Sequence, residues 1–113
     1  MTAKFPVSQT VPAAEIKAKK KNDKNNNYAI TLIAKNLASV DRLAPPRETY
    51  VVWIAAEGQG IKNVGQWAGR NARKSVFETV TPFNVREIFI TAEDDGTVGQ
   101  PTGIEISRVF FRR

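Results

Sequence analysis

The acidic residues between positions 87 and 95 come closest to the spacing of a chemical site. The segment Glu93–Thr97 could offer carboxylate oxygens to calcium, which binds such ligands. It lacks the alternating acidic positions and the distant closing glutamate of an EF-hand loop. Asp-Gly after a strand is by itself a strong turn signal. We therefore predict a structural turn, and no metal site, at Asp94 and Asp95.

The sequence lacks the residues that most often carry out catalysis. The chain of 113 residues contains no histidine and no cysteine, which excludes a Ser-His-Asp triad, thiolate zinc sites and disulfides. Two carboxylate pairs remain. Asp94 and Asp95 are sequence neighbours, which point to opposite faces in a strand, and nothing places Glu87 and Glu93 across a cleft. We predict a protein that is not an enzyme and needs no cofactor.

Lysines near the N-terminus form the main charged cluster. Residues 1–27 hold six lysines and two acidic residues, and so carry most of the net charge of +6. This cluster could contact a nucleic acid or another anionic surface. It could also be a solvated edge strand whose lysines discourage pairing with other chains, and we favour this interpretation because no exposed aromatics interleave with the lysines. Lys19, Lys20 and Lys21 are candidate partner-contact residues, and no nucleic-acid binding is expected.

Three aromatic residues, Tyr28, Trp53 and Trp67, could present a flat platform to a sugar or a peptide. Trp53 belongs to an apolar run, which predicts a position in the core between two sheets. Trp67 precedes a glycine-containing turn and is the better candidate for exposure. It is expected to be a partly buried rim residue or part of a ligand surface, and we retain it as a candidate contact residue.

Apolar and polar residues alternate along much of the chain, and no segment keeps a helical period beyond two turns. The expected strands are Ala14–Lys19, Tyr28–Leu37, Thr49–Ala56, Ile61–Trp67, Lys74–Val80, Val85–Glu93 and Gly103–Phe111. Residues 19–27 are expected to form a hairpin loop, and residues 1–12 an extended leader or an edge strand. We predict an all-β protein in which residues 13–113 form one immunoglobulin-like antiparallel β-sandwich of seven or eight strands with Greek-key connections.

Several short motifs follow the order found in the C-terminal domain of anti-sigma-K factors. Leu43–Pro46 followed by Tyr50–Ile54 resembles the Leu-Pro-Pro and Tyr-x-(Leu/Val)-Trp-(Leu/Ile) stretch of that family. Asn63–Gln66 is similar to its short strand with a glycine. Phe89–Gly96 together with Gln100–Gly103 resembles its ending, which has Thr-x-Glu-x-x-Gly and then Pro-Thr-Gly.

In that bacterial family the domain is an extracytoplasmic β-sandwich, preceded by a transmembrane helix and a cytoplasmic module rich in His and Cys. This chain shows neither element, since no apolar run approaches the roughly 20 residues that span a bilayer. Membrane tethering would need a segment absent from it. The resemblance implies the sandwich and a setting in the cell envelope, without sigma-factor binding or catalytic residues. We expect a non-enzymatic binding or sensory domain that acts through protein contacts. A carbohydrate-binding or cell-surface ligand-binding module is the alternative.

Overall fold

The structure, a computed structural model, describes residues 1–67 and 74–111 and consists mainly of β-strands. The strands are β1 (Thr2–Lys4), β2 (Glu15–Asn22), β3 (Tyr28–Lys35), β4 (Thr49–Ala56), β5 (Gly60–Trp67), β6 (Lys74–Thr81), β7 (Val85–Glu93) and β8 (Ile104–Phe110). A short 3-10 helix, η1 (Val40–Arg42), lies between β3 and β4.

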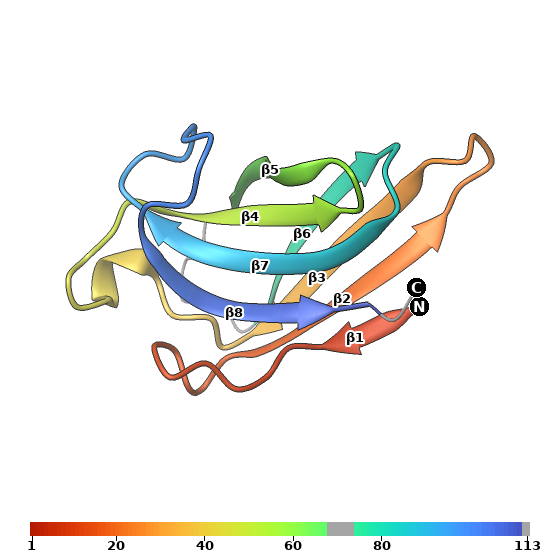
Figure 1. Cartoon of the computed structure of the whole chain (residues 1–113). Coiled ribbons are helices and arrows are strands. Elements are labelled where there is room, and N and C mark those ends of the chain that lie inside the picture. The colour runs from red at the N-terminus through yellow and green to blue at the C-terminus, as the bar shows by residue number, and fades with distance from the viewer. Residues whose placement is uncertain (68–73, 112–113) are drawn as a thin grey trace.

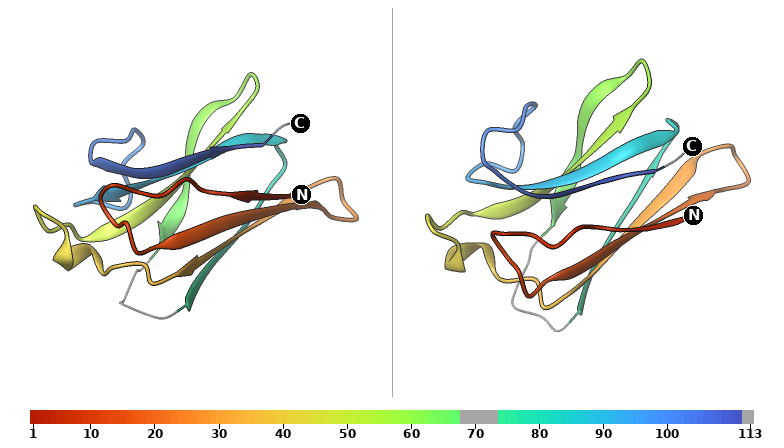
Figure 2. Two further views of the ribbon diagram at one scale, coloured as in Figure 1. Left: turned by 90° about the horizontal axis from the view of Figure 1, so that it is seen from below. Right: turned by 60° about the horizontal axis from the view of Figure 1, so that its bottom comes forward.

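Two antiparallel sheets of four strands pack against each other (Figure 1). Sheet A has the order β1-β2-β3-β6, and sheet B has the order β5-β4-β7-β8. The chain changes sheet between β3 and β4, between β5 and β6, and between β6 and β7, as in an immunoglobulin-like Greek key. The predicted all-β sandwich is confirmed. β1 lies within residues 1–12, which are expected to form a leader or an edge strand, and it pairs with β2 at the edge of sheet A. Figure 2 shows the two layers from further directions.

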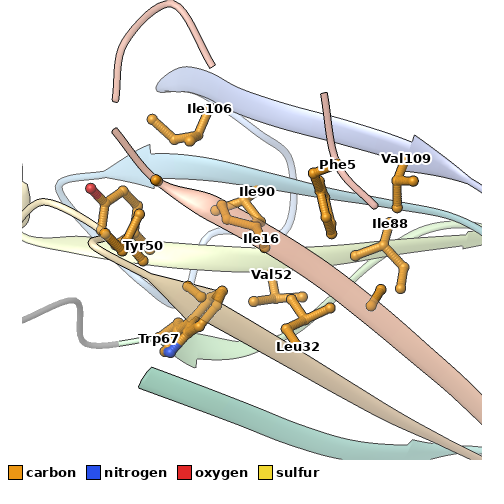
Figure 3. Close-up of a cluster of buried hydrophobic side chains, with 14 of the residues drawn as sticks. Phe5, Ile16, Leu32, Tyr50, Val52, Trp67, Ile88, Ile90, Ile106 and Val109 are labelled. Carbon is orange, nitrogen blue, oxygen red and sulfur yellow. The ribbon is translucent and has the colours of Figure 1, made fainter. Parts of the chain in front are cut away.

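The core lies between the sheets and takes alternate side chains from their strands (Figure 3). Its buried residues include Phe5, Ile16, Leu32, Tyr50, Val52, Trp67, Ile88, Ile90, Ile106 and Val109. Removing this apolar surface from water is the main force that holds the two layers together. β4 is apolar on both faces and lies in the interior of sheet B, which confirms the prediction of a central strand.

In the hairpin between β2 and β3, β2 is longer and β3 is shorter than the sequence predicts. β2 continues to Asn22, within the segment expected to be a loop, because its last residues still pair with β3. The turn is therefore confined to residues after this point. There the Asp23 carboxylate accepts hydrogen bonds from the backbone N–H groups of Asn25 (2.8 Å) and Asn27 (2.9 Å). Asn26 has a φ of 63°, a left-handed conformation that asparagine tolerates.

The connection from β3 to β4 is fixed to the core by its own apolar residues. Asn36 ends β3 with a φ of 58°, so that Leu37 turns into the core. Val40 and Leu43 are buried beside it. At the start of β4, the buried Tyr50 hydroxyl donates a hydrogen bond of 2.6 Å to a backbone carbonyl of this connection. Burial raises the pKa of Tyr50 to about 12, so this donor keeps its proton at neutral pH.

Replacing Tyr50 by phenylalanine tests this attachment. The variant keeps the ring in the core but leaves the carbonyl of Ala38 without its donor. We expect the free energy of unfolding to fall by about 1 to 2 kcal/mol. Urea denaturation followed by circular dichroism measures the change. A variant as stable as the wild type would show that water replaces the phenol at this carbonyl.

Candidate functional site

Part of the outer face of sheet B is covered by the β7–β8 loop, whereas Phe110 on β8 remains exposed on this face. Trp53 points to this face and not, as predicted, into the inter-sheet core. It stacks on Phe89, with ring centroids 5.9 Å apart and planes 8° apart. Both rings are buried, with Val98 of the β7–β8 loop (residues 94–103) packed against them. The predicted position is wrong because a strand that is apolar on both faces does not reveal which face meets the other sheet.

Two contacts fix the β7–β8 loop over this aromatic pair. The side-chain amide of Asn63 on β5 donates hydrogen bonds of 2.9 Å to the carbonyls of Gly96 and Val98. At the other end of the loop, a Cβ atom on Gly103 would lie 1.8 Å from the carbonyl oxygen of Ala92. Only glycine allows the backbone to approach so closely. The loop is therefore part of the packed structure of sheet B.

Glu93, the last residue of β7, is fully buried and holds the same loop through hydrogen bonds. Its carboxylate accepts hydrogen bonds from the hydroxyls of Thr91 (2.7 Å) and Thr102 (2.6 Å). Thr91 in turn accepts a bond of 2.8 Å from the indole N–H of Trp53. Burial by itself would raise the pKa of Glu93, but these hydroxyls and the backbone N–H groups of Thr102 and Gly103 lower it below the usual value. Glu93 thus serves as a charged structural anchor.

The remaining acidic residues of this region are engaged in turns and ion pairs. Asp94 lies 3.2 Å from the Arg47 guanidinium. Asp95 accepts hydrogen bonds from the backbone N–H (2.9 Å) and the hydroxyl (2.6 Å) of Thr97, which closes a tight turn. Glu87 forms an ion pair with an arginine of β8. In the part of the chain that the structure describes, no three acidic residues are grouped as they would be around a metal ion.

Trp67 does not reach the surface. Its exposed fraction is 4%, and its ring lies in the core with its centroid 6.2 Å from that of Phe77 (Figure 3). The prediction that Trp67 lies at a partly buried rim or in a ligand surface is wrong, because the last residue of β5 turns inward, into the core between the sheets. Within the described residues, its buried indole N–H has no hydrogen-bond partner. No flat aromatic platform is formed by Trp67 or by Trp53.

Lys20 also points inward, contrary to its prediction as a contact residue. Its side chain is 7% exposed, and its ammonium group donates hydrogen bonds to the Asn84 side chain (2.9 Å) and the Val85 carbonyl (2.8 Å). The same group lies 4.8 Å from the centre of the Phe111 ring. Burial is the main cause that lowers the pKa of Lys20 below its usual 10.5. Lys20 joins β2 to the β6–β7 turn and to the C-terminal end of sheet B.

The neighbouring lysines lie on the opposite side of β2, on the outer face of sheet A. Lys19 and Lys21 are exposed there, as predicted from sequence. The strand register brings further lysines to the same face from β1, β3 and β6. We call the six residues Lys4, Lys17, Lys19, Lys21, Lys35 and Lys74 the lysine face.

The charge of the lysine face is not balanced within the sheet. Glu15 and Glu78 share this side of the strands, which leaves a net charge of +4. Among the described residues, no ion pair involves any of the six lysines. Lys4 lies directly opposite Lys17, and like charges in that position are destabilising. Glu15 lies opposite Lys35, and this is an opposite-charge pair in the register of the sheet.

The interpretation of the lysine-rich segment as an exposed edge strand is wrong for β2. β1 pairs with Lys17 and Lys19, and the backbone of Met1 and Phe5 continues the pairing at either end. The edge lies one strand further out, since residues 2–4 form a strand of their own. β2 is an interior strand, so its lysines are not needed to protect an edge.

An apolar row crosses the same face. Ile33 on β3 lies opposite Val76 on β6, and Ala29 lies opposite Val80. The exposed fractions of Val76 and Val80 are 46% and 61%, which is high for valine in a strand. A shallow hollow of about 200 Å³ adjoins Ile33, and its lining residues are Lys4, Glu15, Ile16, Lys17, Ile33 and Lys35. Sheet A thus presents aliphatic side chains beside the lysine face.

Comparisons of the chain with protein-family models, with curated proteins and with solved structures give no significant match. Within the described residues, the structure contains no helix of the length and apolar character needed to cross a membrane.

Three members of the lysine face are not apparent from the sequence. Lys4, Lys35 and Lys74 are far apart along the chain, and only the register of β1, β3 and β6 brings them beside the lysines of β2. A signal for the inward position of Lys20 does exist. Lys20 is separated by even numbers of residues from Ile16 and Ala18, which are buried, and such residues share one face of a strand.

Proposed function

We propose that this protein is a non-enzymatic binding domain and that its lysine face, with the aliphatic row beside it, contacts an acidic surface of a protein partner. The observation that carries the proposal is the contrast between the two outer sheet faces. The β7–β8 loop covers the aromatic pair on sheet B, whereas sheet A exposes Val76 and Val80 beside six lysines that form no ion pair within the described residues. The domain would act as a contact or sensory module in the cell envelope, as its resemblance to the anti-sigma-K C-terminal domain implies.

The side chains on this face favour a protein over other anionic or neutral ligands. Single-stranded nucleic acids are held by stacking of bases on exposed aromatics, and sugars by aromatic platforms. The exposed hydrophobic residues on sheet A are instead the valines Val76 and Val80. Aliphatic side chains bordered by charge are typical of protein contacts, in which complementary charge guides association.

Selection of random displayed peptides on the immobilised domain tests this proposal. We expect the enriched peptides to combine aspartate or glutamate with aliphatic residues and to bind more weakly as salt is raised. The double variant Lys17→Ser/Lys19→Ser should weaken their binding about tenfold in calorimetric titrations. The matched control, Lys24→Ser/Arg42→Ser, removes the same charge from exposed positions outside the lysine face and should change the affinity less than about twofold.

Three other ligands are titrated with the same variants: a single-stranded DNA, vesicles of anionic lipid, and a panel of soluble glycans. Tighter binding of the DNA or the vesicles than of any selected peptide, with loss in the Lys17/Lys19 variant, would assign the face to that ligand and overturn the proposal. A glycan bound equally by both variants would support the carbohydrate-binding alternative. Peptide binding that both double variants weaken equally would show a response to net charge and would also contradict the proposal.

A further inference from the structure

The four outermost strands of the two sheets differ in their capacity to accept another strand. β1 has only three residues, and β8 follows β7 with a register shift. β5 contains an irregularity in its pairing with β4 and a glycine, Gly65, with a φ of 144°. β6 is eight residues long and pairs with β3 without any shift. β6 is the outermost strand of sheet A, and its neighbour within the sheet is β3.

β6 has only one of the features that usually protect such a strand, namely the charged residues Lys74 and Glu78. It has no proline and no bulge, and its sequence is rich in β-branched residues. One edge of β6 is hydrogen-bonded to β3. At its other edge, the N–H and C=O groups of alternate residues point away from the sheet. A straight, uninterrupted edge of this kind is a template for strand addition.

The outward side chains of β6 are complementary to a second copy of the same strand. When two copies run antiparallel with Val76 opposite itself, Lys74 of each copy faces Glu78 of the other. Opposite charges in such positions are favourable, and the arrangement contains two equivalent pairs. Centring the pairing on Phe77 places Val76 opposite Glu78, and centring it on Glu78 places two like charges together. The centring on Val76 is therefore favoured over these neighbouring registers.

We infer that a second copy of this chain pairs with β6, antiparallel and centred on Val76, to form a symmetric dimer with one continuous eight-stranded sheet. The interface is isologous, because each copy contributes the same strand. The Ile33–Val76 pairs of the two copies then form a single apolar row across the two-fold axis. The two lysine faces lie side by side on the same surface. This inference does not depend on the partner proposed above.

Charge reversal across the interface tests the pairing and its register. Lys74→Glu and Glu78→Lys each replace two attractive pairs by two repulsive ones, and we expect either variant alone to dimerise about tenfold more weakly than the wild type in sedimentation experiments. Mixing the two variants should restore dimerisation, because each charged residue of one chain then faces a residue of opposite charge in the other. The double variant Lys74→Glu/Glu78→Lys should dimerise like the wild type.

A cysteine at the centre of the interface gives a second measurement. The natural chain has no cysteine, so Val76→Cys introduces a unique thiol that meets its own copy. We expect it to form a disulfide-linked dimer under mild oxidation much faster than the control Val80→Cys on the same strand. A wild type that stays monomeric at millimolar concentration would overturn the inference. Dimerisation that charge reversal leaves unchanged, or that mixing fails to restore, would overturn it as well.

Discussion

Replacing Glu93 by glutamine is expected to lower the free energy of unfolding by about 2 to 4 kcal/mol at neutral pH. The substitution keeps the shape of the side chain but removes the charge that accepts bonds from Thr91 and Thr102. The amide would also turn a donor toward groups that are already donors. Since Thr91 holds the indole of Trp53, the effect should extend to the stacked pair on the outer face of sheet B.

The effect of Glu93 should depend on pH in a defined direction. The pKa of this carboxyl in the folded protein is lowered from a usual value of 4.5. Its stabilising contribution is therefore complete above 4.5 and is lost as the pH falls below that value, through the folded pKa. Urea denaturation at neutral pH and in this acid range should show the gap between wild type and Glu93→Gln becoming smaller in acid.

Asp95 provides the matched control for this measurement. Its carboxylate also accepts two hydrogen bonds from one threonine, but it lies at the exposed tip of the loop. We expect Asp95→Asn to change stability much less than Glu93→Gln, because water replaces the lost bonds at an exposed site. Equal losses in the two variants would contradict the role of burial in the Glu93 anchor.

Lys20→Ser is expected to destabilise the fold by about 1 to 3 kcal/mol, although Lys20 lies within a run of surface lysines. The change leaves the buried carbonyl of Val85 without its ammonium donor and opens space beside Phe111. The neighbours Lys19 and Lys21 are the controls, and serine at either position should alter stability by less than about 0.5 kcal/mol. Thermal and urea denaturation of the three single variants would measure the loss of stability at each of these positions. Three equal effects would contradict the inward position of Lys20.

Much of the fold follows from local patterns. The strand Val85–Glu93 coincides with the predicted segment, and so does Thr49–Ala56. These strands are bounded by proline, glycine and acidic turns, which limit where a strand can begin and end. The eight-stranded sandwich follows from the number and spacing of such segments. In contrast, the end of β2 depends on its pairing with β3, and the asparagine-rich composition of that region indicates only a turn.

The positions of the tryptophans could not be predicted for a different reason. Trp53 belongs to a strand that is apolar on both sides, so periodicity alone cannot decide which side faces the other sheet. The side to which Trp53 points depends on its contact with Val98, which lies 45 residues away in the β7–β8 loop. Trp67 is preceded in β5 by the irregular pairing near Gly65, which disturbs a simple alternation. Long-range contacts determine both positions.

The two tryptophans lie on opposite faces of sheet B, which makes the intrinsic fluorescence of the chain a reporter of two separate regions. Trp53→Phe leaves an emitter only in the inter-sheet core, and Trp67→Phe leaves one only beneath the β7–β8 loop. Release of the loop by itself would shift the emission of the second variant to longer wavelength and leave the first unchanged. Local opening and global unfolding can therefore be distinguished optically, without an added label.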